Sequence, residues 1–274
     1  PAGVSVDFAP ASVTSGQAST MTVTTTSAAT AGDATIVVTG TGSATHSVSV
    51  SLTVTSGGSN TAPSLVQSAS STATAPSTAP ATTLTKPTSA GDLLVLSVSL
   101  YAGTTNHITS ITDSAGNTWV RVNAWSTASH NSDGEMWYAA DVAATSGLTV
   151  TAHVVTAASM AFEVDEFSGI ATTSPLDQSA GASTTGTTAS SGPLTPAASG
   201  ALLIGFSAGH ASTQTMAVSA SGFTAQPQRI STGPVVTLVT GFRVLAAPEA
   251  TSFSASFAAA MYWAAGLAVF RPAP

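Results

Sequence analysis

The sequence predicts an all-β fold, and three observations support that prediction. Apolar residues alternate with Ser and Thr over short stretches bounded by Gly, Pro and Asn, which is typical of half-buried strands. Only 6% of residues are charged whereas 43% are hydrophobic, so the chain can form cores and builds its polar surface from Ser, Thr, Asn and Gly. Finally, GDLLVLSVSL at 91–100 recurs as GALLIGFSAG at 200–209, which indicates an internal duplication.

Residues 1–56 are expected to form a small antiparallel β-sandwich. Their apolar residues alternate in four places, each bounded by a Gly-bearing turn, so four short strands are expected within 4–55. Such a thin sandwich has little core for its surface. The Gly/Ser/Asn-rich segment that follows predicts a linker at 57–64.

Residues 65–274 are expected to form a larger jelly-roll-type β-sandwich built from two similar halves, at about 91–170 and 200–272. Each half is expected to hold four or five strands. The Ser/Thr/Ala/Pro-rich stretch 68–89 suits either an edge strand or a glycosylated segment, and the edge strand is favoured because Leu84 looks buried. The Ala-rich stretch 258–269 has helix propensity, but its counterpart in the first half alternates, which favours a strand.

Composition also excludes several classes of function. The net charge is −7, and no basic patch exists for nucleic acid because the five cationic residues are isolated: Lys86, Arg121, Arg229, Arg243 and Arg271. The longest apolar run, 257–270, is too short to span a membrane as a helix. Cysteine is absent, so there is no disulfide scaffold. A surface rich in Ser, Thr and Ala with almost no Lys predicts an extracellular or cell-surface location.

Two resemblances refine this interpretation. PAGVSVDFAPASVTSGQASTMTV, with TIVVTGTG and SVSVSLTVT, resembles the C-terminal half of a bacterial immunoglobulin-like repeat over residues 1–55. GDLLVLSVS, TDSAGNTW, EMWYAADV and EFSG make residues 61–274 similar to an uncharacterised jelly-roll-like module of secreted bacterial surface proteins. The resemblances imply a partial immunoglobulin-like sandwich and a secreted protein, without implying an activity.

The strands that usually precede the Pro-Ala-Gly-Val turn of such a repeat are missing here. The chain is then a fragment of a longer protein, or the small domain is stable as it stands, or a neighbouring copy supplies the strands. In the last case Val4, Val6 and Phe8 are expected to form the assembly interface, since an incomplete sheet is a template for strand addition.

The acidic run FEVDEF at 162–167 is a candidate calcium site. On a strand, Glu163 and Asp165 share one face and Glu166 lies on the other. Carboxylates suit Ca²⁺, but the second half carries AGLAVF at the same place, so a solvated strand face is the alternative. An acid/base pair is disfavoured because two acids on one strand face do not flank a substrate.

Aromatic residues are the candidates for stacking on sugars. Trp125 precedes a polar stretch and is expected to be exposed, and Tyr101 and Trp119 are further candidates. Asp113 and Asn117 around Gly116 predict a hairpin turn rather than a calcium loop. The five histidines are isolated, so zinc is not expected, and no nucleophile motif is present.

These features predict an extracellular structural or adhesive protein rather than an enzyme. It is expected to be a filament subunit that pairs head to tail with copies of itself through strand complementation, with structural Ca²⁺ as the one ion considered. The alternatives are an accessory module that binds surface polysaccharide for a secreted bacterial enzyme, and a phage fibre or decoration protein.

Overall fold

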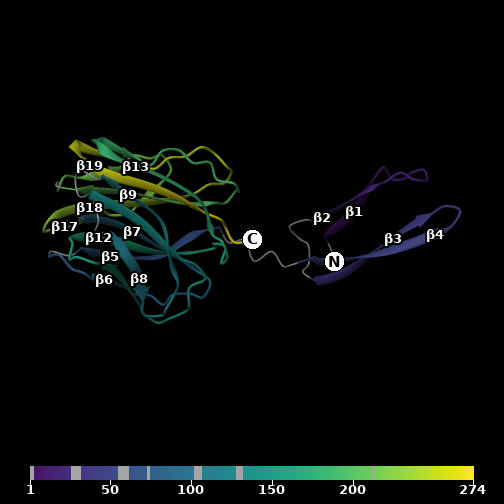
Figure 1. The fold of residues 1–274 in the computed structure, drawn as a ribbon, viewed down its shortest axis with the longest axis horizontal. Helices are drawn as coiled ribbons and strands as arrows, with labels where there is room; N and C mark the ends of the chain where they lie inside the picture. The colour runs from purple at the N-terminus through teal and green to yellow at the C-terminus, as the bar shows by residue number, and fades with distance from the viewer. Residues whose placement is uncertain are drawn as a thin grey trace. The chain divides into compact units, whose positions relative to one another are not determined.

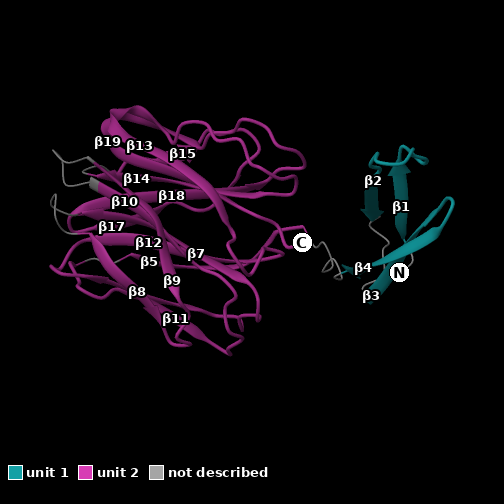
Figure 2. Cartoon of the chain, turned by 45° about the vertical axis from the view of Figure 1, so that its right-hand side comes forward, with its two compact units in different colours: residues 1–60, 274 teal, residues 61–273 magenta. Residues whose placement is uncertain are grey.

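A computed structural model describes residues 3–25, 32–54, 62–72, 75–101, 107–127, 132–210 and 213–274. The described residues contain strands and turns but no helix, so the predicted all-β class is confirmed (Figure 1). It follows that none of them lies in a helix long and apolar enough to cross a membrane. The chain divides into two compact units, residues 1–60 and residues 61–273, called unit 1 and unit 2 below (Figure 2). That division falls inside the predicted linker.

Unit 1 contains two antiparallel hairpins. The strands are β1 (Val4–Ala9) with β2 (Thr20–Thr25), and β3 (Gly32–Thr41) with β4 (Thr45–Val54). They lie where the alternation predicts four strands. Directly opposite residues share a face, so Val6 pairs with Val23 on an apolar face and Asp7 pairs with Thr22 on a polar one.

Unit 2 begins with eight strands that we call the first repeat. They are β5 (Ser64–Thr72), β6 (Ala81–Leu84), β7 (Leu93–Tyr101), β8 (Ile108–Asp113), β9 (Trp119–Thr127), β10 (Ser132–Ala139), β11 (Leu148–Val154) and β12 (Met160–Ser168). One sheet has the order β5-β12-β7-β10-β9 and the other has the order β6-β11-β8. The stretch 68–89 contributes β5 and β6, which are edge strands of the two sheets, as predicted.

The first repeat folds as one long antiparallel hairpin rolled into two sheets. β5 pairs with β12, β6 with β11, and β7 with β10, so the first strand lies beside the last and the pairing continues inward. The tip of this hairpin is the turn between β8 and β9. This nested pairing is that of a jelly roll, except that β9 pairs with β10 in the five-stranded sheet and not with β8.

The remaining strands of unit 2 form the second repeat. They are β13 (Leu176–Ser190), β14 (Leu202–His210), β15 (Met216–Val218), β16 (Thr224–Ala225), β17 (Arg229–Thr232), β18 (Val235–Val244) and β19 (Ser254–Phe270). Residues 262–270 of β19 pair with β14 as β12 pairs with β7, whereas its residues 255–257 pair with β15 as β11 pairs with β8. The long strand β19 therefore occupies the positions of both β11 and β12 of the first repeat. It includes the Ala-rich stretch 258–269, which is a strand and not a helix.

The two repeats thus differ: the first forms two sheets, whereas the described strands of the second belong to one seven-stranded sheet. The sequence predicted two similar halves of four or five strands each. The matched segments occupy equivalent places: 91–100 includes all of β7 except its last residue, 200–209 includes all of β14 except its last residue, and both are central strands. The strands β5, β6 and β13 lie before the matched segments and are rich in small polar residues, so their hydrophobic periodicity is weak.

Three apolar cores hold unit 2 together. One lies between the two sheets of the first repeat. A second lies between the five-stranded sheet of the first repeat and the seven-stranded sheet of the second, and the third lies on the opposite face of that seven-stranded sheet. β7 explains the near-continuous apolar run LLVLSV: Leu94 and Leu96 enter the first core, whereas Leu93 and Val95 enter the second. A strand that is buried on both faces has no solvent-exposed side, so its sequence does not alternate between apolar and polar residues.

Candidate functional site

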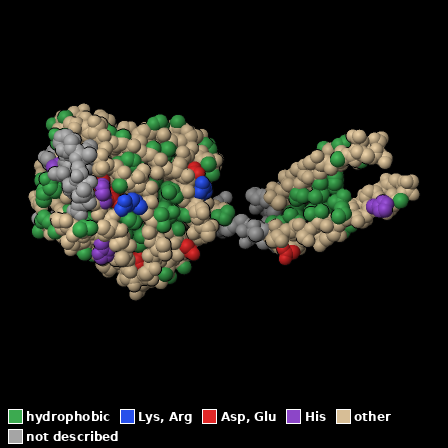
Figure 3. All heavy atoms as spheres, in the orientation of Figure 1, with side chains coloured by type: hydrophobic (Ala, Val, Ile, Leu, Met, Phe, Trp, Pro, Cys, Tyr) green, Lys and Arg blue, Asp and Glu red, His purple; other side chains and the backbone are tan. Residues whose placement is uncertain are grey.

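The apolar faces of the two hairpins in unit 1 are open. Among residues 3–25 and 32–54 none is fully buried, although the alternation gives each hairpin an apolar face. Phe8 is 40% exposed and Val48 is 61% exposed. In space-filling view, hydrophobic side chains gather between the two hairpins (Figure 3). Unit 1 therefore leaves in contact with solvent the side chains that a sandwich would enclose.

A cavity of about 490 Å³ lies against these faces. Its lining includes Val6 and Phe8 of β1 and Ile36 and Val38 of β3. Of the three residues predicted as an assembly interface, Val6 and Phe8 thus line the cavity, whereas Val4 is half-buried outside it. The structure brings the predicted residues together with β3, whose part in this surface the sequence did not indicate.

The acidic strand β12 does not gather its carboxylates into one site. As the alternation predicts, Glu163 and Asp165 lie on one face of β12 and Glu166 lies on the opposite face. Each of the three has its own hydrogen-bond partners. Glu163 accepts hydrogen bonds from Arg229 (2.9 Å) and Thr240 (3.1 Å), both in the second repeat. It is therefore a buried ionic link between repeats.

The other two acids of β12 are buried as well. Ser68 donates a hydrogen bond to Asp165 (2.5 Å), and burial together with the charge of Glu163 raises the pKa of Asp165 to about 7. Glu166 accepts hydrogen bonds from the Gln67 side chain (2.6 Å) and the Ser89 amide (3.1 Å). Glu163, Asp165 and Glu166 therefore do not bring three ligand atoms together with the spacing of a metal site, and the predicted calcium site is not assembled from them.

Glu166 also affects a second buried acid. Burial raises the pKa of Asp92 to about 7, and the hydrogen bond and negative charge of Glu166 add to that increase. Two carboxylates in contact favour sharing one proton.

The predicted exposure of Trp125 is wrong. It lies in β9 with 9% of its surface exposed, and its ring packs on Phe206 of the second repeat with centroids 5.6 Å apart. Tyr101 is half-buried and packs on His210 at 4.4 Å, and the Trp119 indole donates to Asp113 (2.7 Å). Trp125 is buried and Tyr101 and Trp119 are partly buried against the cores, so the three do not form an exposed row of rings.

Asp113 organises the predicted turn between β8 and β9. Its Oδ1 accepts hydrogen bonds from the amides of Ala115 (2.9 Å) and Asn117 (3.1 Å), and Gly116 takes a φ of 76°. The predicted turn is therefore present, but it is not a hairpin turn, because β8 and β9 belong to different sheets and do not pair with each other.

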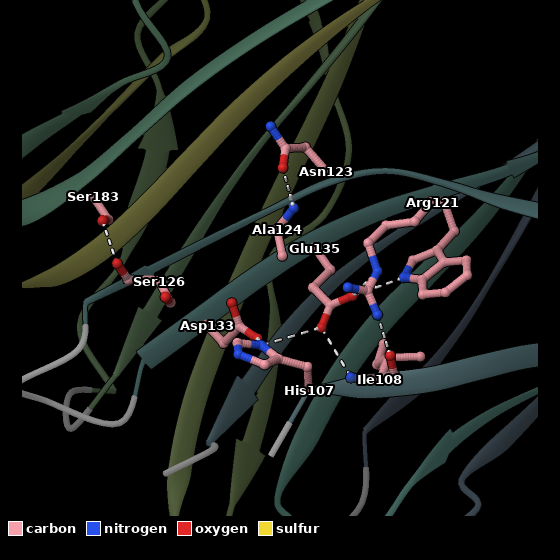
Figure 4. A network of polar contacts seen from close by, with 10 residues as sticks. His107, Ile108, Arg121, Asn123, Ala124, Ser126, Asp133, Glu135 and Ser183 are labelled. Atoms are coloured by element: carbon pink, nitrogen blue, oxygen red, sulfur yellow. Dashed lines mark hydrogen bonds and ion pairs between the residues drawn. The ribbon is translucent and has the colours of Figure 1, made fainter. Parts of the chain in front are cut away.

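A cluster that sequence analysis missed lies at one end of the first repeat, where side chains from both of its sheets converge (Figure 4). His107 immediately precedes β8, Arg121 lies in β9, and Asp133 and Glu135 lie on one face of β10. His107 Nδ1 lies 2.5 Å from Asp133 Oδ2 and 3.7 Å from Glu135 Oε1. The two acids are buried, whereas the His107 side chain is 36% exposed.

Glu135 is held by several donors. The Ile108 amide donates to its Oε1 and the Trp137 indole to its Oε2, each at 2.9 Å, and Arg121 Nε lies 3.2 Å from Oε2. Burial and the charge of Asp133 nevertheless raise the pKa of Glu135 to about 7. Burial also raises the pKa of Asp133, against the opposing effects of His107 and Arg121.

The sequence could indicate only that two of these residues share a strand face. Asp133 and Glu135 alternate with Gly134, so a shared strand face was readable. His107 immediately precedes β8, a strand of the other sheet, and no local pattern in the sequence places it beside β10.

Comparisons of the chain with protein families, with curated proteins and with solved structures returned no significant match. What the chain does is therefore inferred from its own residues and their geometry.

Proposed function

We propose that this chain is an extracellular, non-catalytic structural protein that assembles with copies of itself through unit 1. One observation carries the proposal: no described residue of unit 1 is fully buried, although its strands place apolar residues on one face. A two-stranded hairpin is marginally stable alone, and three or more strands with a covered apolar face are normally needed. Pairing with further strands would meet that need.

The edges of the hairpins favour strand addition. Within the described residues, β1 pairs only with β2 and β3 only with β4, so each strand has one edge without a partner. Proteins commonly protect such edges with Lys, Pro or inward-pointing charges. Residues 1–60 contain no Lys or Arg, and the charged residues within β1–β4 are Asp7 and Asp33. Little in these strands opposes pairing with another chain.

A second copy is the partner that the residues support. The same unit has an open apolar face and also strands with the complementary alternation, for example Val48 and Val50 in β4. Val48 lies opposite Val38 and Val50 opposite Ile36, so both belong to the face that borders the cavity. Two such units joined at an edge would extend both sheets and cover each other's apolar residues.

Unit 2 would serve as the body that the assembly displays. Its three cores make it compact, and its sequence has few charges that would repel a neighbouring copy. A surface built from Ser and Thr supports an extracellular location for such an assembly. A fibre or decoration protein of a phage particle would use the same arrangement.

Sedimentation of the full chain tests the proposal. We expect concentration-dependent oligomers, with filaments visible by negative-stain electron microscopy. Phe8→Asp and Val48→Asp should each weaken association at least about tenfold, because burial of one such side chain contributes about 1.5–3 kcal/mol. Val48 is 61% exposed in the single chain, so its replacement should not unfold unit 1.

Val155→Asp is the matched control, since Val155 is an apolar residue of unit 2 that is 77% exposed and lies far in sequence from the strands of unit 1. It should assemble like the wild type. A wild-type chain that stays monomeric at all concentrations, or Asp variants that assemble normally, would refute self-association through this face.

A further inference from the structure

We propose that His107, Asp133 and Glu135 bind one divalent transition-metal ion of the zinc class. Each offers a ligand atom, and these atoms all lie within 4.8 Å of one another. The three side chains point toward one another from the two sheets of the first repeat (Figure 4). Among the described residues, this is the group of His, Asp and Glu side chains with the spacing of a metal site. It is independent of the assembly face in unit 1.

Asp133 supplies a second observation that points to a missing ligand. It is 1% exposed, and its Oδ1 has no hydrogen-bond partner among the described residues. A buried carboxylate oxygen without a partner is costly, so such oxygens are normally bound by protein, water or an ion. A cation bound at this carboxylate would offset the cost.

The second repeat shows that the jelly roll does not require these acids. β7 matches β14, with Leu100 at the place of Gly209 and Val98 at the place of Ser207. Leu100 pairs with Asp133 and Val98 with Glu135, whereas Gly209 pairs with Thr237 and Ser207 with Val239. Thr237 and Val239 are both buried. The same register positions are therefore filled by neutral residues in one repeat and by carboxylates in the other.

Hydrogen bonds and ion pairs account for the burial of the Glu135 carboxylate, whereas one oxygen of the Asp133 carboxylate has no partner among the described residues. The Ile108 amide, Trp137 and Arg121 already satisfy both oxygens of Glu135. With both acids ionised and His107 neutral, Arg121 offsets one of the two negative charges and the other remains. That remaining charge attracts a cation, and the partly exposed His107 leaves a route to it from solvent.

The donor set selects the kind of metal. One imidazole nitrogen with two carboxylates suits Zn²⁺ or a neighbouring transition metal, whereas Ca²⁺ requires six to eight oxygens. Tetrahedral zinc ligands at about 2.0 Å from the ion lie about 3.3 Å apart. The 3.7 Å between His107 and Glu135 fits that spacing, and the 2.5 Å between His107 and Asp133 would have to open by rather less than 1 Å. Solvent would provide the fourth ligand.

Isothermal titration of the chelator-treated full chain with Zn²⁺ alone tests this proposal. We expect one equivalent to bind and the unfolding temperature of unit 2 to rise. His107→Ala and Asp133→Asn should each weaken binding at least about 100-fold, beyond the roughly 10–100-fold typical of an outer-shell residue. His153→Ala is the control, since His153 lies in β11 and is hydrogen-bonded to Thr112 of β8, outside the cluster.

Circular dichroism would verify that each variant is folded, and the loss of the partly exposed His107 side chain should leave the core intact. If Zn²⁺ neither binds nor raises the unfolding temperature of the wild type, the proposal is wrong. It is equally wrong if His107→Ala and Asp133→Asn bind as the wild type does, or if His153→Ala loses binding to the same extent.

Discussion

Replacement of Trp125 by alanine should strongly destabilise unit 2, because this side chain joins the two repeats. Its ring packs on Phe206 and covers two glycines of the second repeat. A Cβ built on Gly181 would lie 2.3 Å from the indole, and one built on Gly266 would lie 2.5 Å from it. Because neither glycine has a side chain to fill the space, the cavity left by the indole could collapse only partly.

The expected loss is about 4 kcal/mol, within the range of about 3–5 kcal/mol for Trp→Ala in cores. Urea unfolding followed by far-UV circular dichroism would measure it, with Phe8→Ala in unit 1 as a control that leaves the transition of unit 2 unchanged. If Trp125 were an exposed sugar-stacking residue, stability would be unaffected. A loss below about 1 kcal/mol would refute the packing described here.

A double-mutant cycle sharpens the same prediction. Gly266→Ala alone should cost about 1–3 kcal/mol, because the new methyl group meets Trp125 and, at 2.6 Å, Phe206. In the Trp125→Ala background the methyl group enters the vacated space, so the double variant should lose less than the sum. Additivity within about 0.5 kcal/mol would contradict direct contact between the two residues.

Three further predictions concern polar groups. The pKa values of Asp92, Glu135 and Asp165 are raised to about 7 from 3.8 or 4.5, so between those values the folded chain holds protons that the unfolded chain has released. The free energy of unfolding should therefore fall as pH rises from about 4 to about 7, and a flat urea-unfolding profile would contradict this. Asp165→Asn should match the wild type near the acid end and exceed its stability near pH ~8. Trp119→Phe removes the indole hydrogen bond to Asp113 and should cost about 1 kcal/mol by the same assay, whereas no change would mean that water replaces it freely.

Patterns local in sequence predicted most of the fold. Alternation placed the strands of unit 1, and the match between 91–100 and 200–209 identified β7 and β14. The strands β5, β6 and β13 were harder, because Ser, Thr and Gly dominate them and hydrophobic periodicity is weak there. Their pairing comes from the rolled hairpin, which joins the first strand of a repeat to its last.

The environment of single side chains was less predictable. Trp125 was assigned to an exposed loop because polar residues follow it, yet the residues that cover it are Gly181 and Gly266, far along the chain. Sequence shows the absence of a side chain at a glycine but not which ring will occupy the space. The partners of Glu163 and Asp133 likewise come from segments of other sheets, which meet these strands through the packing of one sheet on another.

Charge is distributed in an unexpected way, and this bears on both proposals. Six of the twelve acidic residues are buried, and all six lie in the first repeat: Asp92, Asp133, Glu135, Glu163, Asp165 and Glu166. Because burial raises the pKa of several of them, the surface charge near pH ~7 is smaller than the formal −7 suggests. A weakly charged surface reduces repulsion between copies, which favours assembly through unit 1. The carboxylates themselves are concentrated inside the repeat that contains the proposed metal site, where Asp133 still has an oxygen without a partner among the described residues.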